Sequence, residues 1–383
     1  MGGRQTTSYI ILERSISSSI MQERDYLVGL KHIPGMGAKT INLLVQYFGS
    51  AQHLWHVSEK ELRQHPQLTD NFIEKFFYHR KGLNLEEILA SLANKGIKTV
   101  TVLDEHYPIN LRQIYDPPLV LFYQGEWSKV DAQALGIVGS RKATVYGQKV
   151  AEKLGRELAQ AGFVIVSGMA RGIDSHAHRG CLEVDGRTIG VLGSGLDVIY
   201  PRENYKLAEQ IKANGVLLTE YIPGTAPIAG NFPARNRIIA GLSLGVIVVE
   251  AAIKSGALIT ADFALEAGRD VFAVPGPISS PNSKGTHHLI KQGAKLVDQV
   301  GDILEEYRVV EDAAETEIQG TMFNLTDDEQ AIYDVLSLTP LRVEELAHIT
   351  RWAPGKIQTV LSLLELHGLI EQLPGRQFIR KSL

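Results

Sequence analysis

Short apolar runs alternate with helical segments along the middle of this chain, and that alternation limits the folds it can adopt. Strands that are buried on both faces have nearly continuous apolar sequence, because helices cover both sides of a parallel sheet. Most gaps between the runs are long enough for one helix, which is typical of βαβ units. The pattern predicts an α/β fold with a doubly wound, extended Rossmann-like sheet, its strands at 97–103, 119–124, 135–138, 163–166, 188–192, 216–219, 245–249 and 271–274.

The stretch 135–147, LGIVGSRKATVYG, joins a predicted strand to a predicted helix, which starts near Tyr146. The first turn of a helix favours an anion, because its N–H groups are free and its dipole is positive there. Gly139 lets the backbone approach a ligand closely, Ser140 can donate a hydroxyl, and Arg141 supplies a planar cation suited to phosphate. The turn therefore predicts an anion site, and a tight turn with a surface arginine is the alternative.

Glycine turns with cations or hydroxyls follow the other predicted strands as well. Because the carboxyl ends of parallel strands meet at one edge of a sheet, we expect these turns to form a groove for a polyanion. The ring of Phe232, in the sequence GNFPARNRIIAG, either packs in the core or stacks on a base. The candidate residues beyond the first turn are Ser167, Gly168, Arg171, Gly193, Phe232, Arg235, Asn236, Arg237, Lys254, Ser255 and Gly256.

The sequence argues against a cofactor or a metal. Val198 stands where a dinucleotide-binding GxGxxG motif would need its third glycine, and the chain contains no P-loop motif. His176 and His178 point about 200° apart on a helix, so one helix cannot aim both at the same ion. The single cysteine, Cys181, excludes an internal disulfide and argues against a zinc site built from cysteines. We therefore expect no cofactor, no metal and no catalytic residue.

The formal net charge of −4 hides an uneven distribution. Residues 135–300 hold 18 Lys and Arg against 14 Asp and Glu, whereas 302–329 hold ten acidic residues and one arginine. Bulk charge therefore does not exclude a nucleic-acid partner. No apolar run approaches the roughly 20 residues that a membrane-spanning helix needs. We expect a cytoplasmic protein with no membrane partner.

Helical patterns and a linker flank the predicted sheet. Residues 32–37, HIPGMG, join two helices as in a helix-hairpin-helix, whose backbone amides contact a DNA phosphate or whose helices simply pack together. A capping box at Thr326, three helices and a hairpin predict a winged helix, in which Lys356 and Gln358 are the candidate base readers. The expected organisation is a disordered leader at 1–20, a helical domain at 21–96, the Rossmann-like domain at 97–306, an acidic linker at 307–322 and the winged helix at 323–383.

Four segments of the predicted sheet domain resemble the DprA (Smf) family of DNA-processing proteins. They are GSR at 139–141, SGMARGID at 167–174, FPARNRIIAG at 232–241 and SGALITADFALEAGRDVFAVPG at 255–276. The likeness covers about residues 97–306, and the flanking helical and winged-helix domains agree less specifically. One departure is His287, where the family usually has asparagine, and it puts the contact of that loop in doubt.

The resemblance implies a bacterial protein that is not an enzyme and binds single-stranded DNA in the groove. It also implies a homodimer that loads RecA recombinase onto incoming strands during natural transformation and recombination. Phe232 would then lie beside a base. Backbone phosphates would be held by Gly139, Ser140 and Arg141, and the groove would be lined by Arg171, Arg235, Arg237 and Lys254.

Two other functions remain open. The first is a nucleotide-binding, phosphoribohydrolase-like enzyme of the related Rossmann superfamily, which would carry a compact PGGxGTxxE loop. Here the longer sequence SGALITADFALE places Glu266 at a different spacing, and Pro275-Gly276 falls on another strand. The second is a nucleotide-sensing repressor whose winged helix reads an operator, which the few polar readers of its third helix argue against.

Overall fold

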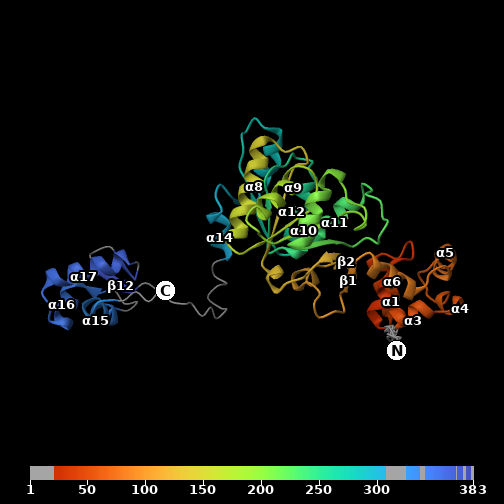
Figure 1. Ribbon diagram of the computed structural model, residues 1–383, viewed down its shortest axis with the longest axis horizontal. Coiled ribbons are helices and arrows are strands. Elements are labelled where there is room, and N and C mark those ends of the chain that lie inside the picture. The colour runs from red at the N-terminus through yellow and green to blue at the C-terminus, as the bar shows by residue number, and fades with distance from the viewer. Residues whose placement is uncertain (1–20, 308–324, 337–340, 368, 374–376, 381–383) are drawn as a thin grey trace, which may run out of the picture. The chain divides into compact units, whose positions relative to one another are not determined.

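The computed structural model describes residues 21–307, 325–336, 341–367, 369–373 and 377–380 (Figure 1). The chain divides into two compact units, 1–309 and 310–383, and each is described by itself. The predicted leader at 1–20 lies outside the described residues, as does all of the predicted acidic linker except Tyr307. That tyrosine is the last residue of helix α14 (Gly301–Tyr307) and packs against Phe163 and Phe272.

A mostly parallel sheet of nine strands forms the centre of the first unit, which confirms the predicted Rossmann-like α/β fold. The strand order is β1-β2-β6-β5-β4-β3-β7-β8-β9, and only the β1–β2 and β2–β6 pairs are antiparallel. The chain progresses from β3 towards one edge and then returns to its other side at β7, which creates a crevice at the strand ends. The strands are β1 (Lys98–Thr101), β2 (Val120–Gly125), β3 (Ala134–Val138), β4 (Val164–Ser167), β5 (Thr188–Val191), β6 (Gly215–Thr219), β7 (Gly245–Val248), β8 (Asp270–Ala273) and β9 (Lys295–Leu296).

Helices cover both faces of this sheet. On one face, α8 (Val145–Gln160) and α9 (Ile173–Leu182) pack with α14 on Leu135 and Ile165. The other face is covered by α11 (Asn231–Leu242), α12 (Gly256–Glu266) and α13 (Lys284–Lys291). Helices α7 (Ile109–Arg112) and α10 (Tyr205–Ala213) complete the layers. Every predicted apolar run is therefore a strand between two helical layers.

In the described part of the chain six helices precede the sheet, and the first of them packs against β1 and β2 (Figure 1). They are α1 (Glu23–Lys31), α2 (Ala38–Phe48), α3 (Ala51–His56), α4 (Glu59–Leu62), α5 (Asp70–Lys81) and α6 (Leu85–Asn94). The predicted pair of helices around HIPGMG is present as α1 and α2. Leu27 and Leu30 of α1 share one hydrophobic core with Phe122 of β2 and Leu217 of β6. The helices and the sheet are thus continuous through their core.

The second unit has the predicted winged-helix elements. Helix α15 (Asp327–Val335) starts at the capping box of Thr326 and Glu329, as predicted. It is followed by β10 (Leu341–Arg342), α16 (Val343–Thr350), α17 (Pro354–Leu366), β11 (Ile370–Leu373) and β12 (Gln377–Arg380). The predicted base reader Lys356 bonds Asp328 at 2.7 Å and lies 3.9 Å from the centre of the Trp352 ring. Contacts within the unit therefore already engage its ammonium group.

A buried histidine on α9 makes the stability of the fold depend on pH. His178 is fully buried, and its Nδ1 hydrogen-bonds Oγ1 of Thr188 at 2.7 Å. Burial lowers the pKa of His178 from 6.5 to about 3. Between these values the unfolded chain binds a proton that the folded protein does not, so stability falls as the pH falls below 6.5. At about pH 5 the expected loss is about 2 kcal/mol.

Urea denaturation at about pH 7 and about pH 5 measures this loss, with His178→Gln as the comparison. Burial raises the pKa of Asp174, which acts in the opposite direction but equally in both proteins. The difference between the two proteins therefore isolates His178. An equal pH dependence in both would contradict this origin of the acid sensitivity.

Candidate nucleic-acid interface

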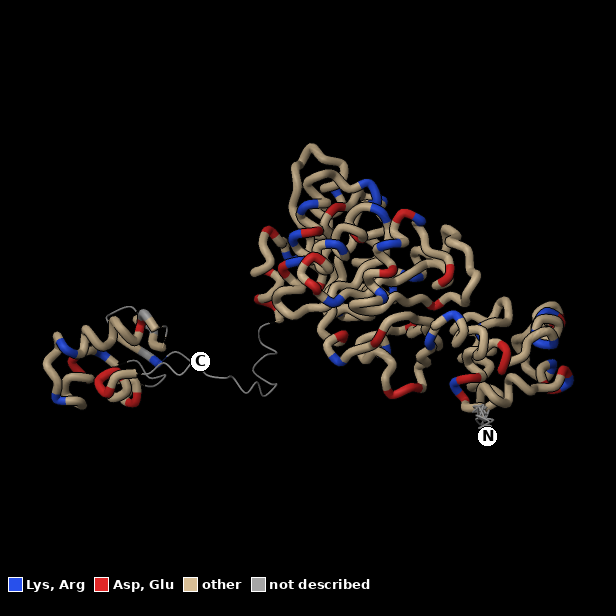
Figure 2. Tube along the Cα trace, viewed as in Figure 1, with Lys and Arg blue, Asp and Glu red and all other residues tan. Residues whose placement is uncertain are grey.

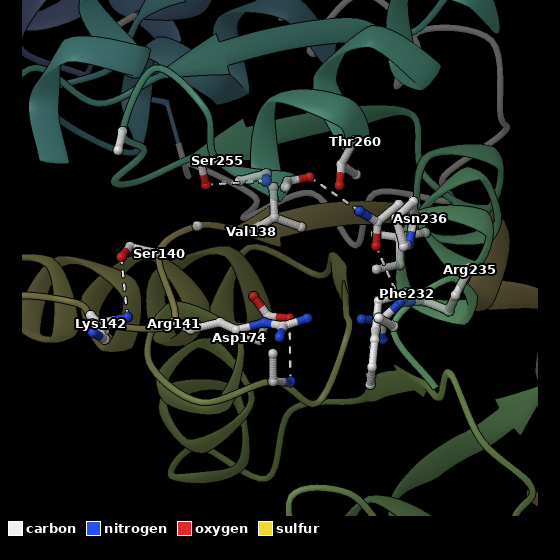
Figure 3. Close-up of a pocket in the computed structure, with 18 of the residues that line it drawn as sticks. Val138, Ser140, Arg141, Lys142, Asp174, Phe232, Arg235, Asn236, Ser255 and Thr260 are labelled. Carbon is white, nitrogen blue, oxygen red and sulfur yellow. Dashed lines mark hydrogen bonds between the residues drawn. The ribbon is translucent and has the colours of Figure 1, made fainter. Parts of the chain in front are cut away.

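A cavity of about 770 Å³ lies at the carboxyl ends of β3, β4 and β7, where the strand order reverses (Figure 3). We call this cavity the groove. Its walls come from the loops after these strands and after β5 and β6, from α11, and from the start of α12. The residues that line it are Val138, Gly139, Ser140, Arg141, Lys142, Ala170, Asp174, Tyr200, Pro227, Ala229, Phe232, Pro233, Arg235, Asn236, Ile239, Ala252, Ser255, Gly256, Ala257, Thr260 and Asn282.

The turn after β3 is held rigidly by the neighbouring strand end. The backbone N–H of Ser140 donates to the carbonyl of Glu250 at 2.7 Å. A Cβ atom on Gly139 would lie 2.9 Å from the same carbonyl and 2.5 Å from Ile173, so the close packing requires glycine. The Glu250 carboxylate in turn accepts from the backbone N–H of Thr144 at 2.9 Å, just before α8. This frame leaves the exposed Arg141 side chain to project into the groove.

Two aromatic rings and one guanidinium lie close together in the groove. The guanidinium of Arg141 lies over the Phe232 ring, 4.8 Å from its centre. The ring of Tyr200 lies 5.7 Å from that of Phe232, tilted by 46°. The backbone of Gly193 packs against Phe232, since a Cβ atom there would lie 3.0 Å from the ring. Of the predicted site residues, Arg141 and Gly193 therefore both lie against Phe232.

Arg235 is a buried cation at the base of the groove. Its side chain is 3% exposed, and Nη1 donates to the carbonyl oxygens of Gly168 and Val191. Burial lowers the pKa of Arg235 to about 10, which leaves the guanidinium charged at neutral pH. Burial raises the pKa of the neighbouring Asp174 carboxyl, against the opposing effect of Arg235. The guanidinium is thus held by backbone contacts, and it is the principal countercharge of Asp174.

Each of the four loops that follow β3, β4, β5 and β7 is fixed by an asparagine side chain from elsewhere in the chain. In every case the amide Nδ2 donates to one carbonyl oxygen of the loop. In the loop after β4 this contact holds a residue in the left-handed region, since Met169 has a φ of 57°. The four asparagine contacts are Asn282 to Lys142 at 3.0 Å, Asn204 to Met169 at 2.9 Å, Asn231 to Gly193 at 3.0 Å and Asn236 to Gly256 at 3.1 Å.

Two predicted groove arginines lie outside the groove. Arg237 follows Arg235 by two residues on α11, so its side chain points to the other side of the helix. There it bonds Glu220 at 2.7 Å, and Lys31 of α1 bonds the same carboxylate at 3.2 Å. Arg171 is exposed and makes two bonds to the carboxylate of Glu203, at 2.7 and 3.0 Å. Both guanidinium groups are therefore paired with carboxylates away from the groove.

Three further predicted residues support the groove or lie next to it. Ser167 is buried, and its hydroxyl donates to the carbonyl of Ile137 at 2.5 Å, so it does not reach the groove. Gly168 makes room for Arg235, whose guanidinium would lie 2.6 Å from a Cβ at this position. Lys254 is exposed in the loop after β7 and does not line the groove, but the next residue, Ser255, does.

Several residues that line the groove are not among the predicted site residues. Asp174, Tyr200, Thr260 and Asn282 line the groove, yet none was predicted as a site residue. Asp174 could have been found, because it ends the SGMARGID segment that had been singled out. His287, the position that departs from the family pattern, donates from Nε2 to the carbonyl of Gly276 at 3.0 Å and so holds its own loop.

The prediction that His176 and His178 face apart is confirmed. His176 bonds Glu152 at 2.7 Å, whereas His178 bonds Thr188. Among the described residues, no group of three or more His, Cys, Asp and Glu side chains is placed to hold a metal ion. In the same part of the chain, no helix is both long and apolar enough to cross a membrane.

Lys and Arg are interspersed with Asp and Glu over the first unit (Figure 2). Arg141 and Lys142 are exposed in the groove, and Ser255 and Gly256, where α12 begins, line the same cavity. Asp174 is the one acidic residue among those that line the groove. The arrangement can bind the phosphates of a ligand that also presents a flat, apolar ring.

Comparison with known proteins identifies the family. The model of the DNA recombination-mediator protein A family matches residues 98–308, and that of the DprA winged helix domain matches residues 320–376. Protein Smf of Synechocystis sp. is 35% identical over 394 residues, which cover 94% of this chain and 99% of that protein. The DNA processing protein DprA of Bacillus subtilis is 46% identical over 237 residues, 62% of this chain and 78% of that protein.

Two solved structures share the fold. The X-ray structure of DNA processing protein A from Streptococcus pneumoniae matches with a TM-score of 0.65 and 38% identity, covering 74% of this chain and 97% of that one. The Helicobacter pylori protein, described for its single-stranded DNA binding mode, matches with a TM-score of 0.50 and 33% identity, covering 56% and 96%. The chain belongs to the DNA recombination-mediator protein A family, also called DprA or Smf.

Proposed function

We propose that this protein binds single-stranded DNA in the groove and, as a cytoplasmic homodimer, loads RecA recombinase onto the strand during natural transformation and recombination. The single observation that carries the binding proposal is the juxtaposition of Arg141 with the rings of Phe232 and Tyr200 at the switch point of the sheet. A cation beside aromatic rings suits an unpaired strand, which offers both phosphates and exposed bases. Membership of the family supports the recombination role.

In this proposal two segments of the groove contact the phosphates. Gly139, Ser140 and Arg141 bind from the turn after β3, and Ser255 and Gly256 bind from the start of α12. Lys254, which is exposed beside them, adds a long-range attraction. Asn236 and Arg235 act from beneath by fixing the shape of the groove. Phe232 lies beside the strand.

The enzyme alternative would need the Glu266 carboxylate in the groove, and the placement of this residue does not support it. Glu266 is the last residue of α12 and is exposed, whereas the groove is formed by the first turn of that helix. Asp174, which does line the groove, has a pKa raised by burial and bonds the backbone N–H of Ala170 at 3.4 Å. We therefore propose that the protein acts by binding and without catalysis.

Binding of equal-length single-stranded and double-stranded DNA at two salt concentrations tests the proposed function. We expect the single strand to bind more tightly, and its affinity to fall as salt rises, because bound phosphates release counterions. The second part of the test adds RecA and measures how much RecA assembles on a strand that is already coated with a single-strand binding protein. Equal affinity for the duplex would contradict the binding proposal, and unchanged RecA assembly would contradict the loading proposal alone.

A further inference from the structure

The two aromatic rings in the groove differ in what already covers them. Phe232 has the guanidinium of Arg141 over its face, and Gly193 lies so close to it that a Cβ atom there would be 3.0 Å from the ring. A base that stacked on this face would displace the cation proposed to hold a phosphate. Phe232 therefore suits the role of a support that fixes the position of Arg141.

Tyr200 is placed differently. Its side chain is 41% exposed and lines the groove, and it meets Phe232 at a tilt of 46°, which is not a face-to-face stack. The tilted contact with Phe232 leaves the Tyr200 ring partly exposed, and the residue lines the groove. Aromatic faces of this kind accept any base, since every base has a π surface.

On these grounds we infer that Tyr200 is the stacking platform for a nucleobase of the bound strand, whereas Phe232 positions Arg141. The inference rests on the proposed function. Tyr200 thus gives the groove a means of preferring strands with exposed bases over a bare phosphate backbone.

Fluorescence anisotropy with two strands of equal length, oligothymidylate and a fully abasic strand, tests the inference. Oligothymidylate should bind wild-type protein more tightly than the abasic strand does. Tyr200→Leu should lose about 5- to 150-fold in affinity for oligothymidylate, the range expected for one stacked base. Its affinity for the abasic strand and its salt dependence should stay unchanged, and Tyr200→Phe should behave as wild type.

Tyr115→Leu is the matched control, because Tyr115 is 98% exposed and does not line the groove. If Tyr200→Leu binds both strands as wild type does, or weakens both equally, the inference is overturned. An equal loss on both strands would assign Tyr200 a structural role, which a lowered melting temperature would accompany. If wild-type protein binds neither strand, the proposed function itself fails. Loss of discrimination between the strands in Tyr200→Leu alone supports the inference.

Discussion

Replacement of Arg235 by alanine lowers the free energy of unfolding by about 3–5 kcal/mol. The guanidinium is 3% exposed, and its removal leaves the carbonyl oxygens of Gly168 and Val191 without their donor. It also leaves the buried Asp174 carboxyl without the stronger of the two cations that act on it. Urea denaturation followed by circular dichroism measures the loss.

Two companion variants show whether the loss comes from these contacts. Arg235→Lys keeps the charge but loses the Nε group that donates to Oδ1 of Asn236 at 3.2 Å, so it should recover only part of the stability. Arg202→Ala removes an exposed arginine that does not line the groove, and it should change stability by no more than about 0.5 kcal/mol. A loss below about 1 kcal/mol for Arg235→Ala would contradict the structural role of this cation.

Replacement of Arg141 by alanine has the largest expected effect on DNA binding. The side chain is exposed, so stability should stay unchanged, while affinity for single strands of any sequence should fall by about tenfold or more. The slope of log affinity against log salt should flatten by about 0.7, the value for one phosphate contact on a single strand. Arg141→Lys should recover part of the affinity, because an ammonium keeps the charge and loses the bidentate geometry.

Arg171→Ala is the matched control for this experiment. Arg171 is also exposed and also follows a glycine-containing turn, but it is bound to Glu203 and does not line the groove. Its removal should leave both the affinity and the salt slope unchanged. If Arg141→Ala also left the affinity and the salt slope unchanged, the turn after β3 would be only a turn with a surface arginine.

The fold was predictable because its signals are local. Four or five apolar residues in a row predict each buried strand, and glycines predict each turn. The sheet can therefore be predicted from short windows of sequence. The short helix α3 lies inside the predicted helical domain, but its six residues are too few to show a helical period of their own. The shared core of Leu30 and Phe122 joins residues far apart in the chain, and no local pattern marks such packing.

The candidate site was only partly predictable, for two physical reasons. Arg235 and Arg237 share one helix at a spacing of two, so at most one of them can face the groove, and the helical period alone implies this. Arg171 is a different case, because its partner Glu203 lies 32 residues away and only the tertiary fold brings them together. Tyr200 comes from a loop, and exposed loop residues carry no period that would reveal them.

The four asparagine contacts have a kinetic consequence. Neutral amide groups fix the loops after β3, β4 and β5 and the start of α12 in the free protein, so an arriving strand meets these segments already held in place. The association rate is then set by diffusion and charge, and substitutions in the groove change chiefly how long each strand resides. A protein with such a groove can exchange strands repeatedly without refolding its binding loops, which suits a factor that must hold DNA and then give it up.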